Sequence, residues 1–179
     1  MDKRTRNIVL VGFSGAGKST VGRMLASRLG WAVVDTDAEI ERRAGKSIAA
    51  IFAEDGEPAF RALEAAVCQQ ASEGDRKVIA TGGGALCNDD TKRAMQATGH
   101  VVLLDVSEEE ALRRLAAHTD RPLLAGEDAA AKLRALYRSR ATFYGQFEQR
   151  VKVDGKTPDQ VVDAIVTDIQ RPAGAHQDR

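Results

Sequence analysis

The sequence predicts an α/β fold in which a parallel sheet is covered by helices on both faces. Short and nearly continuous apolar runs alternate with segments of helical periodicity along most of the chain. Such runs are typical of strands that are buried on both faces. A chain of 179 residues is also long enough to bury a substantial core as one domain.

Five apolar runs, rich in β-branched residues, are the predicted strands. They are IVLVG (8–12), WAVVD (31–35), KVIAT (77–81), HVVLLDV (100–106) and RVKVD (150–154). In open α/β sheets, ligands bind beyond the carboxyl ends of the strands. Glycines or aspartates that could contact a ligand follow four of the five runs, so we expect a binding site at this edge.

The segments between the runs have the periodicity of helices. Val21, Leu25 and Leu29 are spaced along one helical face after the first run. Ser107 and Glu110 have the spacing of a capping box, which predicts that a helix begins after the fourth run. A polar segment with Pro and Gly, HTDRPLLAGED, is long for a connector and is a candidate lid. We therefore expect one domain over residues 1–170, with a lid at about 116–128, and a disordered tail over residues 171–179.

Composition argues against several classes of function. Lys plus Arg (26) equals Asp plus Glu (26), so no net field favours nucleic acid or an acidic membrane. The opening MDKRTRN leads into an apolar run that is too short for a signal or membrane segment. Two cysteines do not indicate a disulfide scaffold, and the three histidines lack metal-ligand spacing. We expect a cytoplasmic monomer that binds neither nucleic acid nor membrane.

The segment GFSGAGKST, at residues 12–20, is a phosphate-binding loop. It satisfies G-x-x-x-x-G-K-[ST], follows a predicted strand and opens a predicted helix. Glycines let backbone N–H groups approach phosphate oxygens, and the helix adds its positive dipole end. Lys18 would contact the outer phosphates, and the Ser19 hydroxyl can ligate Mg²⁺. The expected nucleotide-binding residues here are Gly15, Ala16, Gly17, Lys18, Ser19 and Thr20.

The class of phosphate-loop protein is constrained by what else the sequence contains. It has no NKxD and no DxxG segment, which argues against a GTPase switch. Asp105 ends an apolar run, as a metal-side aspartate would, but it also precedes a capped helix, which is a sufficient structural reason for an acidic residue. In VVDTD, Asp35 and Asp37 would lie on the same side of an extended strand. They would hold either one metal ion jointly or two different partners.

Arginines indicate an acceptor pocket. Arg61 lies in an apolar helical segment where Glu64 can fix its guanidinium, although a surface ion pair would have the same spacing. Arg140 lies on the apolar face of the helix that contains Leu133, so it needs an internal or bound anion unless only its stem is buried. Arg121, in the candidate lid, is either a cis arginine finger or a solvated loop residue.

A run of glycines follows the third predicted strand. In TGGGA, the three glycines at 82–84 would let backbone N–H groups contact a ligand closely. A flexible turn before the next helix is the alternative interpretation.

Taken in order, these motifs resemble those of the shikimate kinases, within the nucleoside-monophosphate-kinase-like P-loop group. The motifs are GFSGAGKST, DTD at 35–37, GE-x-x-FR-x-x-E at 56–64, GGG at 82–84, RPLL at 121–124 and the R-x-x-x-Y of Arg140 to Tyr144. The resemblance runs from about Ile8 to Ile169. It implies a three-layer P-loop kinase fold with a five-stranded parallel sheet and a mobile lid. It also implies transfer of the ATP γ-phosphate to the 3-hydroxyl of shikimate.

The resemblance assigns the acceptor residues. Arg61 and Arg140 would hold the shikimate carboxylate, and Gly83 and Gly84 would line the same pocket. Asp37 would accept hydrogen bonds from the ring hydroxyls, and it would either remove the reacting proton or only orient the hydroxyl. Glu64 would support Arg61.

The resemblance also assigns the phosphate, metal and adenine contacts. Lys18 would stabilise charge on the transferring group, and Arg121 would close with the lid onto phosphate and substrate. Ser19 would ligate Mg²⁺ directly, with Asp35 acting through water. Lys156 and Pro158, in the short loop DGKTP, are the candidate adenine contacts.

Two other functions remain as hypotheses. One is a P-loop kinase for gluconate or a nucleoside monophosphate. A kinase of a phosphate acceptor would be expected to use a different arginine set, and a gluconate-type enzyme would not be expected to carry RPLL with DTD and FR. The other is a nucleotide-binding regulatory domain, which would not require Arg61, Arg140 and Asp37 together.

Overall fold

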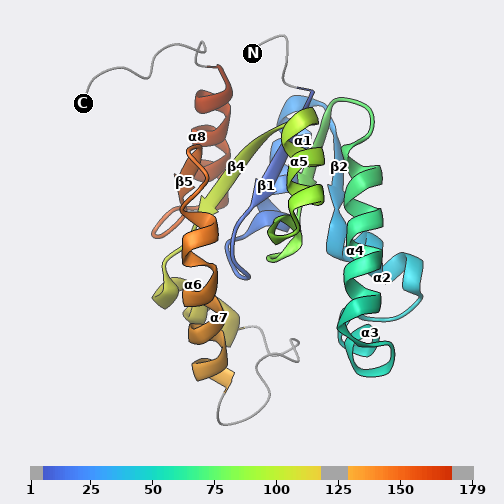
Figure 1. Cartoon of the computed structure of the whole chain (residues 1–179). Helices are drawn as coiled ribbons and strands as arrows, with labels where there is room; N and C mark the ends of the chain where they lie inside the picture. The colour runs from blue at the N-terminus through green and yellow to red at the C-terminus, as the bar shows by residue number, and fades with distance from the viewer. Residues whose placement is uncertain (1–5, 118–128, 171–179) are drawn as a thin grey trace.

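The architecture is a five-stranded, fully parallel sheet flanked by helices (Figure 1). The computed structural model describes residues 6–117 and 129–170. The strand order is β2-β3-β1-β4-β5. The strands are β1 (Asn7–Val11), β2 (Ala32–Asp35), β3 (Lys77–Ala80), β4 (Gly99–Asp105) and β5 (Arg150–Lys152). Each strand coincides with a predicted apolar run to within one or two residues at its ends, which confirms the α/β fold class.

Helices cover the two faces of the sheet. They are α1 (Lys18–Leu29), α2 (Thr36–Ala44), α3 (Ile48–Glu54), α4 (Gly56–Ser72), the 3₁₀ turn η1 (Ala85–Cys87), α5 (Asp89–Thr98), α6 (Glu108–Ala116), α7 (Ala129–Tyr144) and α8 (Pro158–Gln170). Alternate residues of β1 point to opposite faces. Ile8 and Leu10 pack in a cluster with residues of α1 and α8, whereas Val9 and Val11 pack with residues of α4 and α5. The central strand β1 is therefore buried on both faces, as its apolar run predicts, whereas the edge strand β2 is partly exposed.

The strand register brings the expected site residues to one edge. Ala80 of β3 lies between Leu10 of β1 and Asp35 of β2. The loop after β1, the start of α2 and the turn after β3 therefore begin at the same level of the sheet. This edge is the carboxyl edge, where ligands bind in this class of fold.

The expectation that Asp37 extends β2 is wrong. The strand ends at Asp35, and α2 begins at Thr36. Asp35 is the N-cap of α2, because its Oδ1 accepts hydrogen bonds from the backbone N–H groups of Asp37 (3.1 Å) and Ala38 (3.2 Å). The two aspartates are neighbours because one caps the helix whose first turn contains the other.

Three expectations fall outside the described residues. These are the candidate lid beyond residue 117, Arg121 within it, and the tail over residues 171–179. Within residues 6–117 and 129–170, no helix is both long and apolar enough to cross a membrane.

Candidate active site

The loop after β1 is shaped by its glycines. Gly12 has a φ of +148°, and a Cβ there would lie 2.6 Å from the carbonyl oxygen of Leu104. Gly15 and Gly17 also have positive φ, at +84° and +91°. These are backbone conformations that side chains disfavour. Gly17 is the N-cap of α1, so the positive end of the helix dipole is at the loop.

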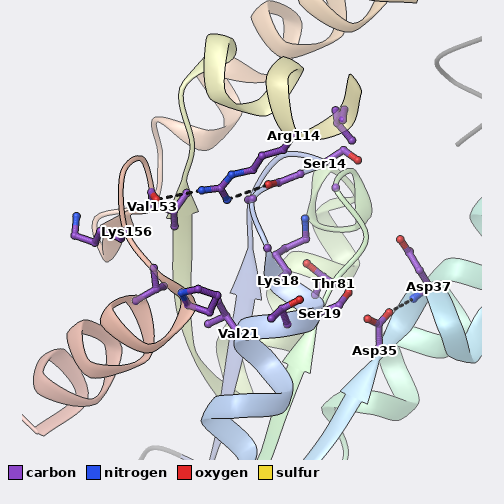
Figure 2. A pocket seen from close by; sticks show the side chains of 18 of the residues that line it. Ser14, Lys18, Ser19, Val21, Asp35, Asp37, Thr81, Arg114, Val153 and Lys156 are labelled. Carbon is purple, nitrogen blue, oxygen red and sulfur yellow. Dashed lines mark hydrogen bonds between the residues drawn. The ribbon is translucent and has the colours of Figure 1, made fainter. Parts of the chain in front are cut away.

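Lys18 reaches back across this loop. Its Nζ donates hydrogen bonds to the carbonyl oxygens of Gly12 (2.7 Å) and Phe13 (3.0 Å). The loop borders a pocket of about 420 Å³, shown in Figure 2. The lining includes residues 14–21, Asp35, Asp37, Thr81, Gly83, Arg113, Arg114, Lys156 and Pro158. All the expected nucleotide-binding residues within the described ranges therefore border one pocket.

The two sides of this pocket differ in chemistry. Figure 2 shows Asp35 and Asp37 on one side of Lys18, with Lys156 on the other. Ser19 is exposed at the start of α1 and borders the same space. The pocket thus has hydroxyl and carboxylate oxygens near one end and basic groups near the other.

Arg114 is a pocket residue that the sequence analysis does not single out. Its Nη1 donates to the carbonyl oxygen of Gly15 and its Nη2 to that of Val153, each at 3.3 Å. Its Nε donates to Glu110 at 2.6 Å. Hydrogen bonds from Arg113 and Arg114 lower the pKa of Glu110 to about 2. The i,i+4 spacing of Glu110 and Arg114 was the only signal in the sequence, and it does not reveal the contacts with the loop.

Arg61 and Arg140 meet at the third glycine of the GGG turn. A Cβ on Gly84 would lie 2.9 Å from Nη2 of Arg140 and 3.4 Å from Nη1 of Arg61. Nη1 of Arg61 also donates to Oε2 of buried Glu64 at 2.7 Å. Burial lowers the pKa of Arg61, but its interactions with Glu64 and Glu57 outweigh burial and raise it. Two guanidinium groups from α4 and α7 therefore converge on one backbone turn.

Carboxylates occupy the other end of the same turn. A Cβ on Gly82 would lie 2.6 Å from Oδ1 of Asp37 and 3.1 Å from Oε1 of Glu64. The Gly82 N–H donates to Oγ1 of Thr36 at 3.0 Å, which ties the turn to the start of α2. A side chain at position 82 or 84 would displace the Asp37 carboxylate or the Arg140 guanidinium, which disfavours the interpretation of GGG as a merely flexible turn.

Asp105 does not border the main pocket. Its Oδ2 lies 3.8 Å from Nη1 of Arg150, and the residue lines a separate cavity of about 130 Å³. The following helix α6 is capped by Ser107, whose Oγ accepts from the N–H of Glu110 at 3.2 Å. Of the two interpretations of Asp105, the structural one agrees with this arrangement.

A family model described as "Shikimate kinase" matches residues 14–170 of the chain. A shikimate kinase from Rhodococcus erythropolis is 44% identical over 164 residues, which cover 90% of this chain and 96% of the relative. A shikimate kinase from Thermobifida fusca is 47% identical over 162 residues, covering 90% of this chain and 93% of the relative.

Solved structures agree with these sequence relationships. The shikimate kinase from Acinetobacter baumannii, in complex with shikimate, superimposes with a TM-score of 0.86 and 36% identity, covering 92% of this chain and 93% of the other. A gluconokinase from Sinorhizobium meliloti superimposes with a TM-score of 0.62 and 18% identity, covering 92% and 91%. At that identity, the second likeness shows a shared fold alone.

Proposed function

The chain belongs to the shikimate kinase family, and we infer that it transfers the γ-phosphate of ATP to the 3-hydroxyl of shikimate, giving shikimate 3-phosphate. The protein is a phosphotransferase of the shikimate pathway. The observation that carries this function is the convergence of Arg61 and Arg140 on Gly84, beside the phosphate-loop pocket.

We propose that the two arginines bind the carboxylate of shikimate. A carboxylate is planar, and the fixed fork of guanidinium N–H donors matches its two oxygens. Glu64 and the more exposed Glu57 both pair with Arg61, but none of the ion pairs among the described residues includes Arg140, so its positive charge is left for an anionic acceptor. The glycine turn keeps this space open.

Asp37 is proposed to contact the acceptor hydroxyls. It lies at the Gly82 end of the turn, opposite the arginines at Gly84, and it also borders the phosphate-loop pocket. A ring held at its carboxylate would therefore present its hydroxyls to Asp37 and to the nucleotide. Asp37 either accepts the hydroxyl proton as a general base or orients the hydroxyl through a hydrogen bond.

The donor set fits Mg²⁺, which prefers oxygen ligands and usually keeps several waters. Within the described residues, no group of three or more His, Cys, Asp or Glu side chains could hold a metal ion alone. A hydroxyl from Ser19 and a carboxylate from Asp35 suit an ion held mainly by nucleotide phosphates. Ser19 would ligate it directly and Asp35 through water, and the bound ion would supply positive charge beside the phosphates.

Phosphoryl transfer requires positioning and electrostatic stabilisation more than covalent chemistry from the protein. Lys18, whose ammonium lies at the loop on the carbonyl oxygens of Gly12 and Phe13, is proposed to stabilise charge on the transferring group. Lys156 and Pro158 border the same pocket and are the proposed adenine contacts. From the composition, we further propose that the protein is a cytoplasmic monomer. Its mass in solution, measured by light scattering after size-exclusion chromatography, tests whether it is monomeric.

The test is an ADP-release assay with ATP and Mg²⁺, offering shikimate, gluconate and nucleoside monophosphates in parallel. Turnover with shikimate alone is the expected result. A folded protein that turns over gluconate or a nucleotide but not shikimate would overturn the proposal. Release of ADP without dependence on any acceptor would favour a regulatory nucleotide-binding domain.

A further inference from the structure

Tyr144, the last residue of α7, connects the GGG turn with the helix that carries Arg140. Its hydroxyl donates a hydrogen bond to the carbonyl oxygen of Gly83. Its ring is half-buried and packs against both large core clusters of the sheet. Arg140 lies one helical turn before it, and the guanidinium interacts with the same hydroxyl. One phenol thus joins the turn, the arginine and the core.

Gly83 is the point where the GGG turn meets the phosphate loop. A Cβ on Gly83 would lie 3.5 Å from the backbone nitrogen of Ser14 and 3.7 Å from the carbonyl oxygen of Gly12. The same Cβ would lie 3.3 Å from Nη1 of Arg140. A side chain at Gly83, whose carbonyl Tyr144 holds, would therefore press against both the phosphate loop and the acceptor arginine.

From this geometry we propose that Tyr144 is a positioning residue for phosphoryl transfer, which fixes the distance between the Arg140 end of the acceptor pocket and the phosphate loop. The inference rests on the proposed function. A turn of three glycines has little intrinsic stiffness, and small misplacements of reacting groups are costly in rate. The Tyr144 hydroxyl supplies a fixed anchor from the rigid core.

The Tyr144 hydroxyl remains protonated and can therefore donate its hydrogen bond to Gly83. Burial raises the pKa of Tyr144 to about 12, although Arg140 opposes this shift. The phenol is therefore protonated at any pH at which a kinase assay is run, and its hydrogen bond to Gly83 does not depend on pH over that range.

Tyr137 provides a matched control on the same helix. Its hydroxyl also donates to a backbone carbonyl, that of Val106, at 2.8 Å, but this carbonyl is not part of the GGG turn. Tyr144→Phe and Tyr137→Phe each remove a hydroxyl that donates one partly buried hydrogen bond to a backbone carbonyl, and both keep the ring. If the role of Tyr144 were only structural, both variants would lose similar thermal stability and neither would affect the acceptor selectively.

We expect Tyr144→Phe to raise the KM for shikimate about three- to tenfold, which corresponds to loss of one hydrogen bond. The value of kcat should fall, and the KM for ATP should change less than about twofold, because the loop itself is intact. Tyr137→Phe should leave the shikimate KM within about twofold of the wild-type value. In an Arg140→Ala background, Tyr144→Phe should cause little further increase in the shikimate KM, since both substitutions act on the same end of the acceptor pocket.

Equal shifts in both KM values, or an unchanged shikimate KM in Tyr144→Phe, would overturn the inference. The chain has only two tyrosines, so 3-fluorotyrosine in Tyr137→Phe labels Tyr144 alone and requires no substitution at this residue. Its ¹⁹F resonance should move on saturation with shikimate, and an unmoved resonance would also overturn the inference. Wild-type protein that does not phosphorylate shikimate would instead refute the proposed function itself.

Discussion

Arg61 and Glu64 form an ion pair in which the carboxylate is buried and the guanidinium is partly exposed. Nη1 of Arg61 lies 2.7 Å from Oε2 of Glu64, and the exposed fractions of the two side chains are 39% and 6%. Glu57 also pairs with Arg61, at 3.1 Å, but it is 63% exposed. The buried partner therefore sets the orientation of Arg61 and holds its Nη1 beside the GGG turn.

Replacing Glu64 by Ala should raise the KM for shikimate about tenfold, because Arg61 loses the partner that orients it. Thermal unfolding should shift down by about 3–6 °C, since removing one partner of a pair is costly but partial exposure of Arg61 moderates the loss. Glu57→Ala, the matched control, should change neither value appreciably. Equal effects of the two substitutions would show that the burial of Glu64 does not determine the orientation of Arg61.

Arg140→Ala should raise the KM for shikimate by more than about tenfold and leave the KM for ATP within about twofold, as expected when a charged contact with one substrate is lost. Arg138→Ala is the control on the same helix, because Arg138 is 71% exposed and pairs only with Glu108 among the ion pairs of the described residues. Isothermal titration with each ligand separates the two affinities. A parallel loss of both affinities would make Arg140 a structural residue.

Gly84→Ala tests the shape of the acceptor pocket. The φ of Gly84 is −117°, so alanine causes no backbone strain there. Its Cβ would, however, lie 2.9 Å from Nη2 of Arg140, which must move. We expect an increase of about tenfold or more in the shikimate KM with a nearly unchanged unfolding temperature. A destabilised protein with normal kinetics would contradict this account of the GGG turn.

The features that sequence predicted well are those determined by local pattern. Apolar runs located all five strands, and in β1 burial on both faces leaves no room for polar alternation, although the edge strands β2 and β5 are partly exposed. The sequence indicates a special role for Arg140, because a charge on the apolar face of a helix requires a nearby anion. The prediction that Asp35 and Asp37 share one strand was wrong. In sequence, an aspartate at position 35 is equally compatible with a continuing strand and with a helix N-cap, and the N-cap starts α2 at Thr36.

Long-range contacts account for what the sequence could not reveal. Arg114 contacts a carbonyl 99 residues away, and Tyr144 contacts one 61 residues away. In sequence, the first looks like half of a helical ion pair, and the second like an apolar-face aromatic that belongs to the R-x-x-x-Y motif. Only the fold brings either side chain to a glycine loop.

Asp35→Asn and Asp37→Asn separate the roles of the two aspartates. Asparagine caps helices about as well as aspartate, so Asp35→Asn should keep α2 and remove only the charge. This variant should need several-fold more Mg²⁺ for half-maximal rate. Asp37→Asn should keep the wild-type Mg²⁺ dependence and lower kcat with shikimate by about 10²-fold or more, within the usual contribution of a positioned acid or base. The same metal defect in both variants would restore the interpretation of one shared metal site.

The two cysteines should report on the acceptor pocket through their reactivity. Burial raises the pKa of Cys68 to about 12, and this residue is in the core. Cys87 is exposed at the end of η1, but partial desolvation of its thiol raises its pKa, although nearby Arg140 and Arg61 oppose the shift. A raised pKa means less thiolate at a given pH, so labelling of Cys87 by a disulfide reagent should be slow at pH 8 and accelerate with rising pH through pH 9.

Each cysteine that reacts releases one thiol from the disulfide reagent. The native protein should therefore release one equivalent of this thiol, and the denatured protein two. Shikimate bound by the two arginines should slow labelling of Cys87, whereas ATP alone should not, because Cys87 does not line the nucleotide pocket. Cys87→Ser should abolish native labelling and serves as the control. A labelling rate that is already constant below pH 8 would indicate a lowered pKa, and protection by ATP alone would place Cys87 outside the acceptor pocket.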